Sequence, residues 1–133
     1  MRLYKLFSLA LAAIFALVGL IFLFFPDAAL TFFNRISGYI GLPQAPVPGT
    51  GFYLILAAAY MYLVTILAYR MYRYPKENIY PLLLAHGKLA SSVISIYLFL
   101  VHQPYLIYLA NFVIDGSLGM AALYLMKMRK TEV

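Results

Sequence analysis

Two charged side chains, Lys88 and Asp115, each stand inside a long apolar stretch of the sequence. The two stretches, residues 79–101 and 104–126, are joined by a short turn at Gln103. If they form antiparallel helices, a rise of about 1.5 Å per residue places the two charges within ~3 Å of each other in height. A charge inside a membrane span costs on the order of 3 kcal/mol, so it is expected to face inward toward a partner. We therefore predict that Lys88 and Asp115 form an ion pair.

Other polar residues accompany the two charges at helical spacing, which gives each helix one polar face. Tyr60 lies near the middle of an earlier apolar stretch, residues 52–70. We expect its hydroxyl either to bond to a backbone carbonyl or a serine, or to reach the ion pair. The predicted intramembrane polar cluster comprises Lys88, Asp115, Asn111, Ser91, Ser92, Ser95, Tyr60 and His86.

These residue types permit a few kinds of chemistry. A serine one turn from Lys88 would form a Ser-Lys dyad if the lysine were neutral, but pairing of Lys88 with Asp115 is the favoured alternative. His86 and His102 would lie about 24 Å apart on one helix, so they cannot bind the same haem. A metal site formed by His86 with Asp115 or Asp27 would need further ligands that the sequence does not supply. We predict no catalytic residue, no metal and no cofactor.

Composition places these side chains in a membrane. The chain has 133 residues, of which 65% are hydrophobic and 11% charged, and its mean hydropathy is +0.90. Such a chain is too apolar for a soluble domain. The absence of cysteine excludes disulfides, thiolate nucleophiles and iron-sulfur ligation by this chain. The net charge of +6 comes mostly from the ends of apolar stretches, so we predict no nucleic-acid partner.

The sequence predicts an all-α integral membrane protein, a bundle of four transmembrane helices with a short interfacial helix between the first two. A span needs about 20 mostly apolar residues. The predicted spans are residues 4–25, 52–70, 79–101 and 104–126. Residues 28–39 mix apolar and polar side chains and predict an amphipathic helix that lies on the membrane, with Asp27 as its N-cap. A loop rich in proline and glycine, which ends at Gly51, then leads to the second span.

Basic residues indicate the orientation. Eight of the ten Lys and Arg residues lie at the N-terminus, in the loop after the second span or at the C-terminus, whereas Arg35 alone lies in the segment after the first span. Positive residues mark the cytoplasmic side. We therefore predict a multi-pass protein of the plasma (inner) membrane with both termini in the cytoplasm.

The layout resembles the DoxX-like group of small four-helix membrane proteins. The first span ends at Phe25-Pro26, an outer amphipathic segment follows, and a short basic loop joins the second span of the chain to the third. The resemblance covers most of the chain. It implies an accessory or small-ligand-binding membrane protein, some relatives being subunits of quinone-linked oxidoreductases, and it assigns no functional residue.

Small-residue ridges predict close packing against other helices. They comprise Ala12, Ala16 and Gly19 in the first span, and Gly119 and Ala122 in the last. Together with the lack of catalytic motifs, these ridges favour a non-enzymatic structural or accessory subunit that assembles with other membrane subunits or with copies of itself.

Two alternatives use the polar cluster directly. The first is a bundle that binds a lipophilic small molecule, a lipid or a quinone, in a pocket among the helices. That pocket would be lined by Tyr60, Lys88, Ser92, Asn111 and Asp115. The second is a proton-coupled transporter of a small solute, in which Asp115 takes up and releases a proton.

Overall fold

The computed structural model describes residues 1–46 and 51–131, and in these ranges all of its regular secondary structure is α-helix. The helices are α1 (Arg2–Phe24), α2 (Pro26–Ile40), α3 (Gly51–Arg73), α4 (Ile79–Val101) and α5 (Leu106–Thr131). Four of them, α1, α3, α4 and α5, are long and apolar enough to cross a membrane, by length and composition. The prediction of four long helices and one short helix is therefore confirmed. Residues 47–50 of the predicted loop lie outside the described residues.

The ends of the helices differ from the prediction mainly in α5. This helix begins at Leu106 rather than at residue 104, because Tyr105 N–H bonds to Gln103 O within the turn. It continues to Thr131 instead of ending at residue 126. Lysine and arginine are good helix formers and interact favourably with the carbonyl end of a helix, so the basic tail extends the helix.

The short helix α2 begins with Pro26 in its first turn. The fixed φ of proline is close to the helical value, so proline favours this position. The prediction that Asp27 caps this helix is wrong. The N-cap residue is Phe25, whose side chain makes no hydrogen bond. Asp27 lies in the first turn, where its negative charge interacts favourably with the positive end of the helix dipole. The last residue of the helix is Ile40, and its C-cap is Gly41. The φ of Gly41 is 75°, the left-handed conformation that glycine adopts readily.

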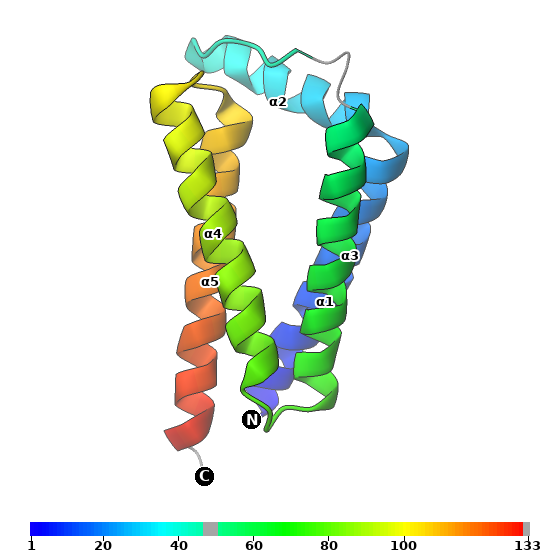
Figure 1. Cartoon of the computed structure of the whole chain (residues 1–133), viewed down its shortest axis with the longest axis vertical. Coiled ribbons are helices and arrows are strands. Elements are labelled where there is room, and N and C mark those ends of the chain that lie inside the picture. The colour runs from blue at the N-terminus through cyan, green and yellow to red at the C-terminus, as the bar shows by residue number, and fades with distance from the viewer. Residues whose placement is uncertain (47–50, 132–133) are drawn as a thin grey trace.

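Two antiparallel helix pairs make up the molecule, α1 with α3 and α4 with α5 (Figure 1). The pairs approach each other at the end that holds both termini and residues 74–78, which we call the closed end. They diverge toward the other end, which we call the open end. There α2 runs across from one pair to the other (Figure 1).

Glycines let the helices of each pair approach closely. A Cβ atom at Gly19 would lie 3.0 Å from Met61 Cβ, and one at Gly119 would lie 2.8 Å from Leu89 Cγ. Both predicted small-residue ridges therefore contain a glycine that packs against another helix of the same chain. Ala12 and Ala122, from the same ridges, are also buried.

The buried apolar side chains gather toward the closed end. The core comprises Tyr4, Leu11, Ala12, Phe15, Val64, Ala68, Met71, Leu84, Ala85 and Ala122. Apart from Phe15, which lies just past the middle of α1, these residues come from the first half of α1 and of α4 and from the second half of α3 and of α5. Because the chain passes up and down in turn, those halves all lie at the same end (Figure 1).

Arg129 connects three segments of the chain at the closed end. Its guanidinium donates hydrogen bonds to the Pro75 carbonyl and to Asn78 Oδ1, and its Cζ lies 4.6 Å from the centre of the Tyr4 ring. The side chain is buried. Arg129 thus joins α5, the loop between α3 and α4, and the start of α1. The sequence placed Arg129 only among the basic residues that mark orientation.

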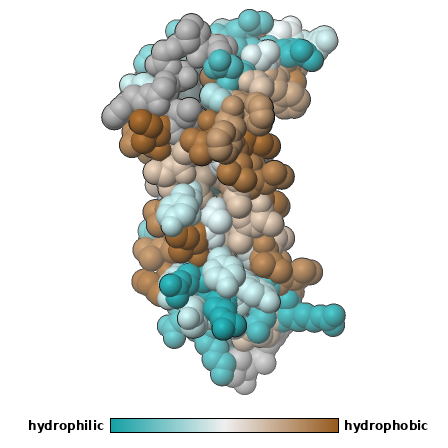
Figure 2. All heavy atoms as spheres, turned by 90° about the vertical axis from the view of Figure 1, so that its right-hand side faces the viewer, coloured by the Kyte–Doolittle hydropathy of each residue, from teal (hydrophilic) through white to brown (hydrophobic). Residues whose placement is uncertain are grey.

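The outer surface is apolar around the middle of the long helices. Figure 2 shows hydrophobic side chains over most of the middle of the molecule and hydrophilic side chains at both ends. Large apolar side chains such as Leu17, Leu63 and Leu100 are exposed. A soluble monomer rarely exposes an apolar surface of this extent, so the surface, like the four long helices, suggests a membrane protein.

Candidate functional site

Lys88 of α4 and Asp115 of α5 form a buried ion pair. Lys88 Nζ lies 2.9 Å from Asp115 Oδ1, and the two side chains are only 3% and 5% exposed. The predicted pairing is confirmed, and so is the antiparallel register about Gln103. Pairing is what makes burial of both charges tolerable, since either one alone in an apolar interior would be strongly unfavourable.

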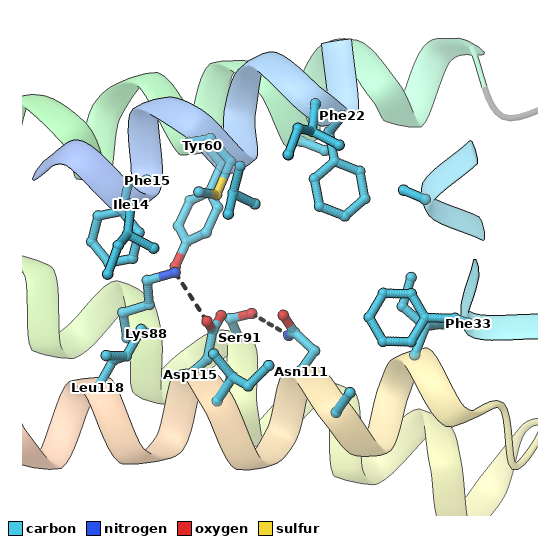
Figure 3. A pocket seen from close by; sticks show the side chains of 18 of the residues that line it. Ile14, Phe15, Phe22, Phe33, Tyr60, Lys88, Ser91, Asn111, Asp115 and Leu118 are labelled. Atoms are coloured by element: carbon cyan, nitrogen blue, oxygen red, sulfur yellow. Dashed lines mark hydrogen bonds and ion pairs between the residues drawn. The ribbon is translucent and has the colours of Figure 1, made fainter. Parts of the chain in front are cut away.

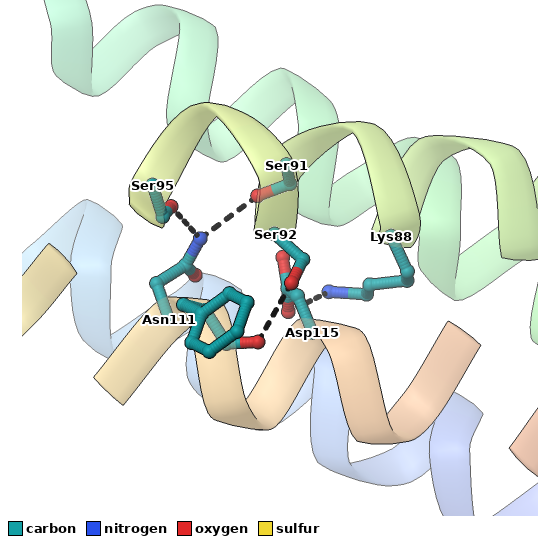
Figure 4. A network of polar contacts seen from close by, with 7 residues as sticks. Lys88, Ser91, Ser92, Ser95, Asn111 and Asp115 are labelled. Atoms are coloured by element: carbon teal, nitrogen blue, oxygen red, sulfur yellow. Dashed lines mark hydrogen bonds and ion pairs between the residues drawn. The ribbon is translucent and has the colours of Figure 1, made fainter. Parts of the chain in front are cut away.

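Neighbouring polar residues connect the same two helices (Figure 4). Asn111 Nδ2 donates to Ser91 Oγ at 2.8 Å and to Ser95 Oγ at 2.7 Å. Ser92 Oγ donates to the Phe112 carbonyl at 2.8 Å. The polar faces of α4 and α5 therefore meet as predicted, and their hydrogen bonds hold the register that brings Lys88 to Asp115.

Aromatic rings of the other helix pair enclose the ammonium group. Lys88 Nζ lies 4.4 Å from the centre of the Phe15 ring and 5.1 Å from the centre of the Tyr60 ring. Both distances are within the range of a cation-π interaction. Phe15 was not predicted in the cluster, because it belongs to α1 and nothing in the local sequence separates it from other apolar residues.

Tyr60 packs its ring beside Lys88, but its hydroxyl makes no hydrogen bond to the ion pair. The hydroxyl is buried, and it has no hydrogen-bond partner in the part of the chain that the structure describes. The interpretation that it bonds to a backbone carbonyl or a serine is therefore wrong. Figure 3 shows Tyr60 extending from α3 toward Lys88.

His86 does not belong to the cluster, and its inclusion was wrong. Its side chain is exposed, and Nδ1 lies 2.8 Å from the Leu82 carbonyl of the same helix. His86 is two residues from Lys88, and a helix turns by about 200° over two residues, so the two side chains point in different directions.

A cavity of about 680 Å³ lies between the helix pairs, on the side of the ion pair that faces α2 (Figure 3). Polar side chains at its floor are Tyr60, Lys88, Ser91, Asn111 and Asp115. Its apolar walls and roof include Phe22, Phe32, Phe33, Ala57 and Ala110. The predicted pocket residue Ser92 is not among the lining residues, because its hydroxyl turns to the Phe112 carbonyl. Ser91, one residue earlier, lines the cavity instead.

The floor of the cavity keeps some capacity for hydrogen bonds. In the described residues, Asp115 uses only Oδ1 and Asn111 uses only its amide nitrogen. The Tyr60 hydroxyl has no partner in these residues, and the Ser91 hydroxyl accepts from Asn111 but donates to none of them. Two acceptor oxygens and two hydroxyl hydrogens thus remain at the end of an otherwise apolar space, and the charges of Lys88 and Asp115 cancel.

The geometry does not favour the catalytic alternatives. A Ser-Lys dyad needs a neutral lysine, whereas Lys88 is paired with a carboxylate. The candidate nucleophiles within about one turn of Lys88 are Ser91 and Ser92, and Ser92, the more buried of the two, donates its hydroxyl hydrogen to Phe112 O. Within residues 1–46 and 51–131, no three or more His, Asp or Glu side chains lie close enough to hold a metal ion.

Comparison with known proteins gives no match to a protein-family model, to a curated protein or to a solved structure. The resemblance to DoxX-like proteins therefore stays a prediction from the layout of the chain.

Proposed function

We propose that this chain is a multi-pass membrane protein that binds a lipophilic small molecule in the cavity between its two helix pairs. The observation that carries the proposal is the shape and chemistry of that cavity: apolar walls, a volume of about 680 Å³ and a polar floor. Small-molecule sites commonly have volumes of about 300 to 1,000 Å³, mostly apolar walls and a few placed polar groups.

The depth of the floor supports a lipophilic ligand. Lys88 lies near the middle of α4 and Asp115 near the middle of α5. If the four long helices span a bilayer, the polar floor lies close to its centre, at a depth that a lipid-soluble molecule reaches easily. Polar groups at this depth are costly, and they commonly mark binding sites or pathways.

The alternative of an accessory subunit receives less support from the packing. Both small-residue ridges that favoured partner subunits contain a glycine that packs within the chain, at Met61 for Gly19 and at Leu89 for Gly119. These ridges no longer argue for a further helix from another subunit. The cavity, by contrast, is left unfilled by the described part of the chain.

Filling the cavity tests the proposal. Ala110 lines the cavity, so Ala110→Phe places a ring within it, whereas Ala13→Phe adds the same ring to an exposed position of α1. Protein purified in mild detergent would be extracted with organic solvent and its bound lipids identified by mass spectrometry. We expect one lipophilic species to accompany the parent and Ala13→Phe at near-equal molar amounts and to be lost from Ala110→Phe. An identical lipid profile in all three proteins would contradict the proposal.

We also propose that the closed end faces the cytoplasm across the inner membrane, as the distribution of basic residues favours. Since the chain has no cysteine, single substitutions can be labelled without background. Tyr39 is 84% exposed at the open end, and Thr131 is exposed at the closed end. On intact cells an impermeant maleimide should label Tyr39→Cys and not Thr131→Cys. Labelling of Thr131→Cys alone would reverse the orientation.

A further inference from the structure

The unused hydrogen-bonding groups at the floor of the cavity indicate which ligand end would fit there. If the cavity binds a lipophilic molecule, as proposed above, its floor selects the polar end of that molecule. Four properties of the floor bear on this selection: the net charge, the bonding of Lys88, the free acceptors and the free hydroxyl of Tyr60.

The floor carries no net charge, because Lys88 and Asp115 neutralise each other at 2.9 Å. A charged ligand end would add an unpaired charge to a buried site, where desolvation is costly. A carboxylate would also lie near the Asp115 carboxylate, and an ammonium would lie near Lys88. The floor therefore favours a neutral ligand.

Lys88 is not available as a strong donor to the ligand. One of the three N–H groups of its ammonium bonds to Asp115, and the rings of Phe15 and Tyr60, whose centres lie 4.4 and 5.1 Å from the nitrogen, make cation-π contacts with the remaining charge. Its side chain is 3% exposed. An acceptor-only ligand, such as a quinone or an ether, would therefore meet hydroxyl donors at Tyr60 and Ser91 rather than the ammonium group.

The free acceptors are the groups that such a ligand would leave unpaired. Asp115 Oδ2 and Asn111 Oδ1 accept no hydrogen bond from the described residues. An acceptor that lines a largely apolar cavity and meets no donor is unfavourable, so a ligand that donates to these two oxygens gains more than one that cannot. A hydroxyl group both donates and accepts, and so matches the free acceptors and Tyr60 at once.

We propose that the cavity binds a neutral lipophile whose polar end is a hydroxyl group, with the O–H donating to Asp115 Oδ2 or Asn111 Oδ1 and the oxygen accepting from the Tyr60 hydroxyl. The apolar body of such a ligand would extend toward α2, along the walls formed by Phe22 and Phe33 (Figure 3). Recognition is thus a matter of hydrogen-bond polarity, with no net charge involved.

A matched set of isoprenoid probes tests this proposal. Radiolabelled farnesol would be bound to the full chain in lipid nanodiscs and displaced by unlabelled farnesol, farnesyl methyl ether, farnesoic acid or farnesylamine. The four share one apolar body and differ only in the polar end. We expect farnesol to compete roughly tenfold better than the other three, the effect of one lost hydrogen bond in a buried site.

Two variants locate the effect. Tyr60→Phe removes only the free hydroxyl, and we expect it to weaken farnesol binding about tenfold. Tyr62→Phe makes the same change at an exposed position of α3 and should leave binding unchanged. Parent affinity for farnesol in Tyr60→Phe would overturn the assignment of that hydroxyl to the ligand.

Ala110→Phe separates this inference from the proposed function. If all four probes compete equally and Ala110→Phe abolishes their binding, the cavity is a ligand site but its preference for a hydroxyl is wrong. If the acid or the amine competes best, the inference of a neutral end is wrong. If Ala110→Phe prevents the binding of none of the probes, the inference is wrong. The proposed function is wrong as well only if, in addition, the purified parent carries no lipid that is absent from Ala110→Phe.

Discussion

The closed and open ends of this molecule are built from the same four long helices, yet they differ in what occupies the space between the helix pairs. At the closed end, large side chains such as Tyr4, Leu11 and Leu84 fill that space, and Arg129 ties three segments together. At the open end a cavity of about 680 Å³ remains beneath α2. The ion pair of Lys88 and Asp115 lies at the boundary.

The difference shows how a small chain can combine stability with a binding site. Some positions that face the gap at the open end are small, as at Ala57 and Ala110, and the helix pairs diverge there (Figure 1). Close packing at the closed end stabilises the fold, so the open end can retain an unfilled space. The ion pair is part of the packed region and also part of the cavity floor.

The largest effect is expected at the boundary itself. Lys88→Met or Asp115→Leu alone leaves one buried charge unpaired, and the free energy of unfolding should fall by about 3 to 5 kcal/mol. The double variant should recover most of that loss. The measurement is unfolding in mixed micelles on titration with sodium dodecyl sulfate, followed by circular dichroism. Lys127→Met, at an exposed charge of α5, is the control and should change stability by less than ~0.5 kcal/mol. Single variants as stable as the parent would show that the charges do not support each other.

The next prediction compares the effect of truncating one apolar side chain at each end of the molecule. Leu84 is fully buried in the closed end, so Leu84→Ala should cost about 2 to 5 kcal/mol through lost contacts and a new void. Ile107 already borders the cavity, so Ile107→Ala opens no new void and should cost less than ~1 kcal/mol. The same unfolding titration measures both. Equal losses would mean that the open end is as closely packed as the closed end.

Glycine substitutions sharpen the contrast on a smaller scale. In Gly119→Ala the new Cβ would lie 2.8 Å from Leu89 Cγ and 3.4 Å from the Ala85 carbonyl, so α5 must shift, at a cost of about 1 to 3 kcal/mol. In Gly38→Ala the nearest side-chain atom would be Gln44 Nε2 at 3.9 Å. The gain in helix propensity there should raise stability by up to ~1 kcal/mol. A neutral Gly119→Ala would show that the helices of the pair are further apart than the structure has them.

The smallest effect is expected from Tyr60→Phe. Because the Tyr60 hydroxyl has no partner in the described residues, its removal should leave stability within ~0.5 kcal/mol of the parent or raise it slightly. Tyr62→Phe, at an exposed position, serves as the control. A loss above ~1 kcal/mol in Tyr60→Phe alone would reveal a hydrogen bond to the protein and would remove that hydroxyl from the cavity floor.

The sequence by itself determined the long helices, their order and the pairing of Lys88 with Asp115. These follow from local properties: apolar stretches long enough to span, a tight turn at Gln103, and polar residues that recur every three or four positions. The turn fixes the register of α4 against α5. Two charged residues that are a similar number of positions from Gln103 therefore lie at similar heights and can meet. The bounds of α4 were predicted without error for the same reason.

Only the tertiary structure decided how the two helix pairs sit against each other. Three features join segments that are far apart in the chain: the contacts of Phe15 and Tyr60 with Lys88, the hydrogen bonds of Arg129, and the cavity. They depend on the tilt and rotation of whole helices, which no local pattern encodes. His86 illustrates the same limit, since helical spacing gives the relative direction of two side chains but not which direction faces the interior. Packing at the closed end sets that direction, and with it the space that remains at the open end.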